Sequence, residues 1–197
     1  FQNGKISSSN GDNTNRDNII IPLSNLTRQI GQGIYTGAKE IFVSQNNIIV
    51  ENELLKPIVD GADLEPYTYP MPQKHLIYPY KINGVNLELI DLQLYPKALG
   101  YLSAFKSELL KRRFWGETIA SAGKEFYEIW NPSPFIFAPK IMYAEIASKP
   151  TFTIDLDGEL ACLKTCYCIV LRDDAMVSMY FLLSLLNSKF LFYSLIQ

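Results

Sequence analysis

Apolar positions along the chain follow two different spacings, which predict strands and helices in one molecule. Short apolar runs bounded by turn residues recur along most of its length, as is typical of strands. We expect strands near residues 19–21, 41–43, 48–50, 76–80, 135–137, 141–146, 152–154, 159–163 and 167–171. Asp157-Gly158 lies between two of these runs and predicts a hairpin turn, because Gly tolerates the positive φ of tight turns.

Helical spacing predicts two substantial helices. Pro96 suits the first turn of a helix, since its missing N–H would have no partner there. The apolar positions of this helix are Leu99, Leu102, Phe105, Leu109 and Leu110. A second helix is expected over 175–187, with a continuation after Ser188, and a short one over 53–60. The pattern therefore predicts an α+β fold: a mixed, mainly antiparallel twisted sheet with a long basic helix and a C-terminal helix.

The N-terminal segment differs in composition from the rest of the chain. Residues 3–18 are rich in Asn, Ser, Gly and Asp, which is typical of a linker. The whole chain is 48% hydrophobic and 19% charged, enough for a packed core. We expect residues 1–27 to be a flexible extension and residues 28–197 to form one domain. Because the sequence begins at Phe1, we expect it to be a piece of a longer polypeptide.

The sequence has three cysteines, an odd number that cannot all pair with one another in disulfides. This favours a protein of the reducing cytoplasm over a secreted disulfide scaffold. Zinc is disfavoured because Cys162, Cys166 and Cys168 include no pair separated by two residues and no fourth ligand is evident. No secretory signal opens the sequence, and no apolar run approaches the roughly 18 residues that span a bilayer. We therefore expect a cytoplasmic protein without a bound metal and without a membrane partner.

Catalytic chemistry finds little support in the sequence. His75 is the one histidine in the sequence, which disfavours serine or cysteine catalytic triads and excludes metal sites built from several histidines. We expect His75 to be structural or at the surface. The segment 131–135 resembles the Asn/Asp-Pro-Pro-aromatic tetrad of amino-methyltransferases, but Ser133 separates the two prolines. No glycine-rich S-adenosylmethionine loop precedes it. We predict a Pro-fixed loop before a strand, no catalytic residues and no cofactor in this chain.

Charge is unevenly distributed, although the net charge is only −2. Residues 96–114 carry five cations against one acid, whereas residues 51–65 carry five acids against one lysine. Lys111, Arg112 and Arg113 precede Trp115 where the expected helix ends, and such a cluster suits DNA. A solvated helix end whose cations offset the helix dipole would carry the same residues, and both interpretations stay open.

The order of these pieces resembles the C-terminal specificity domain of TaqI-like DNA methyltransferases, which also occurs in type IIG fused restriction–modification enzymes. The first matching motif is Gly33-Ile34-Tyr35-Thr36-Gly37, and the resemblance as a whole covers roughly residues 28–195. The further matching pieces are 41–43, 54–57, 61–64, 76–79, 95–96, 101–102, 105–106, 109–110, 113, 127–129, 139–141, 152, 155–158 and 182–189. The family usually has a Trp ahead of Tyr127-Glu128, where this chain has Phe126, so the register of that loop stays open.

The resemblance implies a domain that recognises bases while a separate S-adenosylmethionine domain flips and methylates adenine. The expected partners are double-stranded DNA and the methyltransferase domain of the same polypeptide. The parent would be a bacterial restriction–modification adenine-N6 methyltransferase, alone or fused to an endonuclease. Two alternatives stay open: a protein-interaction or scaffold domain without DNA binding, and a small hydrolase complete in this chain.

Candidate contacts with DNA divide into two sets. Phosphate contacts are expected from Lys97, Lys106, Lys111 and Arg112, and from Lys39 near the turn at 36–37. Thr36 in this turn is a further candidate contact with DNA. Base-edge contacts are expected from Gln29, Gln32, Arg113, Trp115 and Lys124. Glutamine suits adenine and arginine suits guanine, because each can form a bidentate contact with that base. Lys140 is expected to serve the fold.

Overall fold

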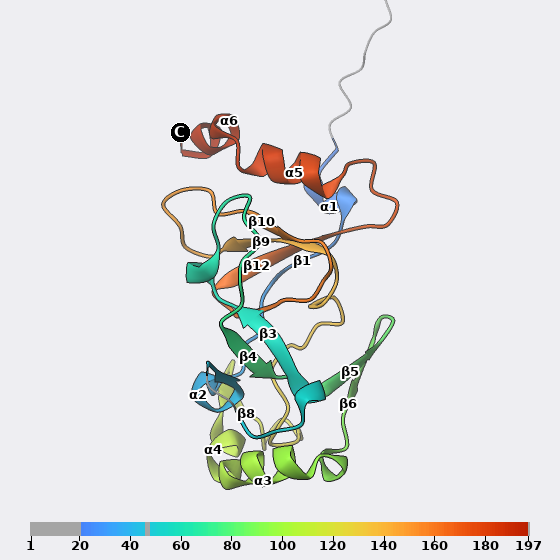
Figure 1. Ribbon diagram of the computed structural model, residues 1–197, viewed down its shortest axis with the longest axis vertical. Coiled ribbons are helices and arrows are strands. Elements are labelled where there is room, and N and C mark those ends of the chain that lie inside the picture. The colour runs from blue at the N-terminus through green and yellow to red at the C-terminus, as the bar shows by residue number, and fades with distance from the viewer. Residues whose placement is uncertain (1–20, 46–47, 197) are drawn as a thin grey trace, which may run out of the picture.

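The computed structural model describes residues 21–45 and 48–196 (Figure 1). Its helices and strands are α1 (Leu23–Leu26), β1 (Thr27–Gln32), α2 (Lys39–Phe42), β2 (Val43–Ser44), η1 (Asn52–Leu54), β3 (Leu55–Val59), η2 (Gly61–Asp63), β4 (Lys74–Ile77), β5 (Tyr80–Asn83), β6 (Asn86–Leu89), η3 (Leu92–Leu94), α3 (Pro96–Ala104), α4 (Lys106–Lys111), β7 (Arg113–Phe114), β8 (Glu117–Thr118), β9 (Lys140–Ala144), β10 (Thr153–Asp155), β11 (Ala161–Cys162), β12 (Cys166–Leu171), α5 (Met179–Leu186) and α6 (Lys189–Ile196). The α+β class is confirmed. Most of the expected linker, and residues 19–20 of the first expected strand, lie outside the described residues.

One antiparallel sheet has the strand order β1-β12-β9-β10. Its alternating apolar positions form a row across the sheet, in which Ile30 pairs with Ile169 and Ile169 pairs with Ile141. Helix α5 covers this part of the sheet by packing Leu182 and Leu183 against Ile141 and Ile169 (Figure 1). The expected C-terminal helix is confirmed, with the Ser178 hydroxyl accepting a hydrogen bond from the Phe181 N–H at its start.

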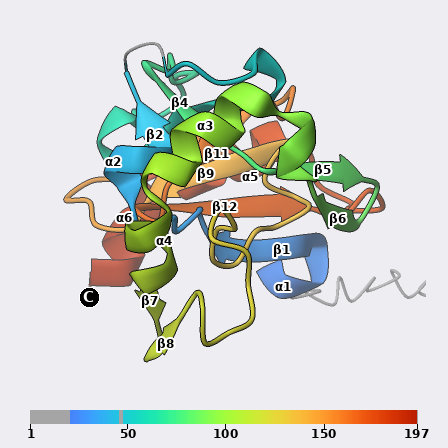
Figure 2. The same cartoon turned by 90° about the horizontal axis from the view of Figure 1, so that it is seen from below.

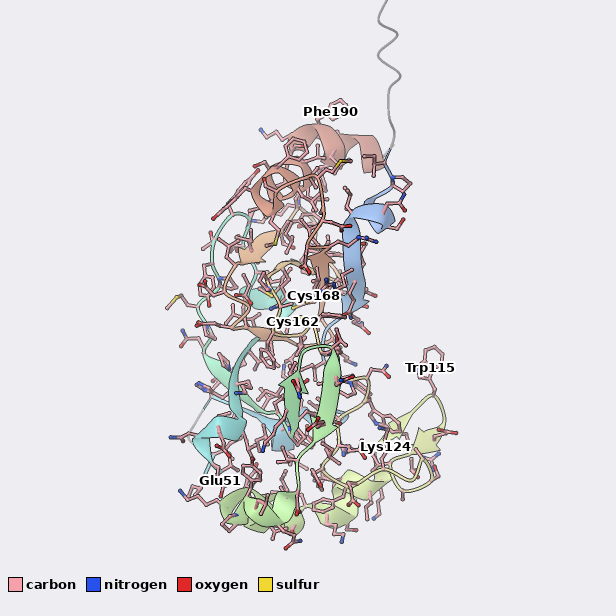
Figure 3. The ribbon with its side chains drawn as sticks, turned by 90° about the vertical axis from the view of Figure 1, so that its right-hand side faces the viewer. Glu51, Trp115, Lys124, Cys162, Cys168 and Phe190 are labelled. Carbon is pink, nitrogen blue, oxygen red and sulfur yellow. The ribbon has the colours of Figure 1, made fainter. Side chains whose placement is uncertain are left out.

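A second sheet has the order β11-β3-β4-β2 and lies within the larger core. Strands β11 and β3 are parallel, while β4 pairs antiparallel with both β3 and β2. Buried thiols connect the two sheets: Cys162 Sγ on β11 lies 2.8 Å from Cys168 Sγ on β12 (Figure 3). Hydrogen bonds with Cys166 and Cys168, together with burial, raise the pKa of the Cys162 thiol, so this thiol stays protonated.

A fully buried ion pair fixes the loop that follows β10. Lys140 Nζ lies 2.6 Å from Asp155 Oδ2, and the Asp155 carboxylate also accepts hydrogen bonds from three backbone N–H groups at 158–160. A side chain at Gly158 would place its Cβ 2.2 Å from the carbonyl oxygen of Phe137. The expected hairpin at 157–158 is wrong, because β10 and β11 belong to different sheets. Lys140 serves the fold, as expected.

The expected long basic helix is two helices, α3 and α4, which meet at Phe105. Glu51 caps the first one, since its two carboxylate oxygens accept from the backbone N–H groups of Lys97 and Ala98 at 2.8 and 2.9 Å (Figure 3). Helices α3 and α4 lie at the opposite end of the molecule from α5 and α6 (Figure 1).

Four local expectations were wrong or only partly right. Residues 53–60 form η1 and β3 instead of a helix, because pairing with β4 and β11 overrides local propensity. Residues 135–137 form a turn, and residues 48–50 form no strand. Of residues 41–43, only Val43 lies in a strand, since Ile41 and Phe42 end α2. None of the helices in the described ranges has the length and apolar character needed to cross a membrane.

Candidate nucleic-acid interface

A groove with a volume of about 850 Å³ lies beside β1, the edge strand of the first sheet. Its lining residues come from five chain segments and are Gln29, Gly31, Gln32, Gly33, Tyr35, Arg113, Trp115, Asn131, Pro132, Ser133, Pro134, Phe135, Glu145 and Lys164. Four of the expected base contacts, Gln29, Gln32, Arg113 and Trp115, are therefore brought together at one site. Strand alternation directs the two glutamines to opposite faces of β1, yet both border the groove.

One wall of the groove is the β7–β8 hairpin, which projects from the body of the molecule (Figure 2). Its two-residue turn consists of Trp115 and Gly116, with φ angles of 52° and 91°. Two consecutive positive φ values are typical of a type I′ turn, in which Asn or Gly is the usual first residue. Tryptophan in this conformation costs on the order of 1–2 kcal/mol. Trp115 is 91% exposed, and its side chain points away from the hairpin (Figure 3). The turn thus displays a large aromatic side chain at the edge of the groove.

Another wall is the loop 131–135, where Asn131 is exposed and also has a positive φ, 48°. Ser133 Oγ accepts a hydrogen bond from the Phe135 N–H at 3.2 Å and donates to Gln29 Oε1 at 2.8 Å. Because the Gln29 oxygen is occupied in this way, its amide N–H groups remain to donate. This loop was expected to be fixed by its prolines and to precede a strand, but a turn follows it instead.

The remaining groove residues lie where β1, β9 and β12 end or begin. Gln32 Nε2 donates to Glu145 Oε1 at 3.2 Å, and Lys164 Nζ lies 4.8 Å from the centre of the Tyr35 ring. Gly33 lies directly after β1, where the chain packs closely against the end of β11. A Cβ at this position would lie 2.4 Å from the carbonyl oxygens of Cys162 and Leu163, so there is no space for a side chain. The groove therefore combines cationic, carboxylate, amide and aromatic groups.

Two expected contacts are wrong, because Arg112 and Thr36 are buried, at 5% and 3% exposure. The Arg112 guanidinium donates to four carbonyl oxygens, those of Leu109, Thr36, Phe126 and Glu128, at 2.6–2.9 Å. Burial lowers the pKa of Arg112 to about 10, so it remains a cation at neutral pH. Its donors are used within the fold, and it cannot reach a phosphate.

The expected lysine contacts lie outside the groove lining. Lys124 forms an ion pair with Glu128 at 2.9 Å, and Lys39 lies 3.4 Å from the Asp60 carboxylate. Lys97, Lys106 and Lys111 are exposed on α3 and α4. Because α4 leads directly into the β7–β8 hairpin, Lys111 is the one of these expected lysine contacts that is nearest in sequence to a groove wall.

Sequence patterns missed Asn131, Ser133, Glu145 and Lys164 as members of this site. Each lies more than 95 positions from Gln29 or Gln32, and no local motif marks Glu145 or Lys164. Ser133 had one signal, since it interrupts a pair of prolines, and the structure shows it holding Gln29. Across residues 21–45 and 48–196, no three His, Cys, Asp or Glu side chains are grouped so that they could hold a metal ion.

The sequence matches a known family over most of its length. The model of the TaqI-like C-terminal specificity domain matches residues 56–195, which include the β7–β8 hairpin, the loop 131–135, Glu145 and Lys164. This match covers more than half of the chain and agrees with the resemblance drawn from the order of its motifs. The chain therefore belongs to the TaqI-like C-terminal specificity domains, which are DNA-recognition domains of methyltransferases.

Proposed function

We propose that the chain is the sequence-specific double-stranded DNA recognition domain of a bacterial, cytoplasmic restriction–modification enzyme that methylates adenine at N6. The groove beside β1 contacts base edges in the major groove, while exposed lysines on α3 and α4 contact phosphates. The domain positions the target for a methyltransferase domain of the same polypeptide, which can be fused to an endonuclease.

The gathering of Gln29, Gln32, Arg113 and Trp115 in one groove carries this proposal. Amide and guanidinium groups match the donor and acceptor patterns of base edges, and tryptophan can stack on bases or wedge between them. Phosphate binding alone would need only positive charge, whereas this groove also includes Glu145, which repels phosphate. Its mixed chemistry therefore favours contact with bases.

Methyl transfer belongs to another part of the parent enzyme in this proposal. The loop 131–135 lacks adjacent prolines, and its Ser133 hydroxyl is bonded to Gln29 on the groove wall. We expect S-adenosylmethionine to bind to the catalytic domain and not to this chain. Titration calorimetry of the chain with S-adenosylmethionine tests this division, and saturable binding would contradict it.

Binding to random-sequence duplexes at a series of salt concentrations tests the main proposal. We expect affinity to fall steeply with salt, because phosphate contacts release condensed counterions. Selection from a duplex library should then enrich one sequence. A chain that shows neither salt-dependent binding nor an enriched sequence would contradict the proposal.

A protein-interaction domain without DNA binding is the second candidate. Large apolar side chains are exposed on α5 and α6, among them Phe181 at 59% and Tyr193 at 63%. Phe190 is 80% exposed and points outward from α6 (Figure 3). Exposed aromatic residues are typical of protein interfaces. In this case a partner protein would bind the chain while the library selection enriched no DNA sequence.

A further inference from the structure

Glu145 fixes the direction in which Gln32 faces the groove. An ionised carboxylate only accepts hydrogen bonds, so the Gln32 amide must turn its NH₂ group toward Glu145 Oε1, 3.2 Å away. The Gln32 carbonyl oxygen is then the group left to face a ligand. The orientation of an amide is usually ambiguous, but a carboxylate partner decides it.

Glu145 itself is held in place beside this amide. Its backbone N–H donates to the carbonyl oxygen of Thr165 at 2.8 Å, directly after β9. Its side chain is exposed and, within residues 21–45 and 48–196, forms no ion pair with a lysine or arginine. Both residues line the groove, and their mutual hydrogen bond leaves two acceptors, Gln32 Oε1 and Glu145 Oε2, available to a ligand.

On the basis of the proposed function, we propose that the Gln32–Glu145 pair selects cytosine by accepting a hydrogen bond from its exocyclic N4 amine in the major groove. Base pairing with guanine leaves one N4 hydrogen free, and Gln32 Oε1 and Glu145 Oε2 would share it. On the side away from guanine the neighbouring group of cytosine is a C–H, which repels neither acceptor. Thymine presents an O4 acceptor, which the carboxylate repels. Adenine has the N6 amine but also an N7 acceptor, which would lie beside the same carboxylate.

This assignment changes what the sequence indicates for Gln32. A glutamine alone suits adenine, because its amide can donate to N7 and accept from N6 at once. In this protein one hydrogen of the Gln32 amide is already donated to Glu145, and the carboxylate charge lies next to Gln32 Nε2. Glu145 is therefore a specificity-determining residue, acting both as an acceptor and through the orientation of Gln32.

Selection from a duplex library with randomised central positions tests the assignment, using the full chain and its Glu145→Gln variant. We expect one cytosine position at which the wild-type chain prefers C·G over T·A by roughly 5- to 150-fold, as measured by binding of the two duplexes. Glu145→Gln should bring this ratio close to one, because its new amide can donate to thymine O4.

Glu88→Gln is the matched control, since Glu88 is an exposed glutamate on β6 that does not line the groove. It removes the same charge and should keep the C·G preference. If Glu145→Gln fails to fold by circular dichroism, Gln32→Met should lower the same ratio. An unchanged ratio in the folded variants, or a change at an adenine position instead, would overturn the assignment. A wild-type chain that enriches no sequence would overturn the proposed function, and this inference with it.

Discussion

Arg112 and Arg113 are neighbours in the sequence, yet they belong to different regions of the molecule. Arg112 ends α4 and turns inward, where four carbonyl oxygens and the Phe42 ring surround its guanidinium. Arg113 begins β7, is exposed and lines the groove. The backbone is extended at Arg112, with φ −55° and ψ 137°, and successive side chains of an extended chain point to opposite sides.

The difference shows that a cluster of cations near a helix end can serve two purposes. Arg112 joins the turn at Thr36, the end of α4 and the segment 126–128, and so fixes the base of the β7–β8 hairpin. Arg113 lies on the β7–β8 hairpin, whose base the hydrogen bonds of Arg112 hold in place. We infer that the buried arginine contributes to stability and that the exposed one contributes to recognition.

The largest expected effect is on stability. Arg112→Ala should lower the free energy of unfolding by about 3–5 kcal/mol, because it leaves buried carbonyl groups without donors. Arg113→Ala should change it by roughly 0.5 kcal/mol or less, as surface substitutions do. Urea denaturation of both variants measures the difference. Equal effects would contradict the division between the two arginines.

The reverse order is expected in DNA recognition. Arg113→Ala should reduce discrimination between the preferred duplex and a single-base variant by about 1–3 kcal/mol, the contribution of a bidentate contact to guanine. Competition binding with duplexes that differ at each position would locate the base pair affected. An Arg113→Ala chain with an unchanged sequence preference would remove this residue from the recognition surface.

Trp115 extends the comparison between stability and recognition, because its substitution should raise the stability of the fold and lower the affinity for DNA. Trp115→Asn should raise the free energy of unfolding by roughly 0.5–1 kcal/mol, since Asn is favoured in the left-handed region. The same variant should bind DNA more weakly, because an aromatic side chain beside the groove is lost. Thermal denaturation and binding are measured on the same samples. If stability and affinity both fell, Trp115 would be a structural residue.

The smallest effect concerns phosphate contacts. Lys111→Gln should weaken binding about equally for preferred and random duplexes and reduce the salt slope by about one unit. Lys124→Gln is its control, because Lys124 is already paired with Glu128. We expect a smaller change in slope for this control. Identical slopes for the wild-type chain and Lys111→Gln would show that α4 does not face DNA.

Local patterns predicted the α+β class and most strands of the first sheet, because alternation and helical spacing depend on neighbouring residues. They also suggested Gln29, Gln32, Arg113 and Trp115, which the fold brings to one groove. Burial at Arg112 could not be predicted, since three of its four carbonyl partners lie 14–76 positions away. Residues 53–60 show the same limit, because pairing with distant strands decided their conformation.

The groove is discontinuous in the sequence, and this has a consequence for attempts to redesign it. Its side chains come from β1, the β7–β8 hairpin, the loop 131–135, Glu145 and Lys164. Grafting one loop from a relative would therefore transfer only a fragment of a binding preference. Exchanging exposed groove side chains such as Gln32, Arg113 and Glu145 together, while keeping Gly33 and Arg112, would alter the preference without disturbing the scaffold. Altered target sequences are thus accessible by combined surface substitutions instead of segment exchange.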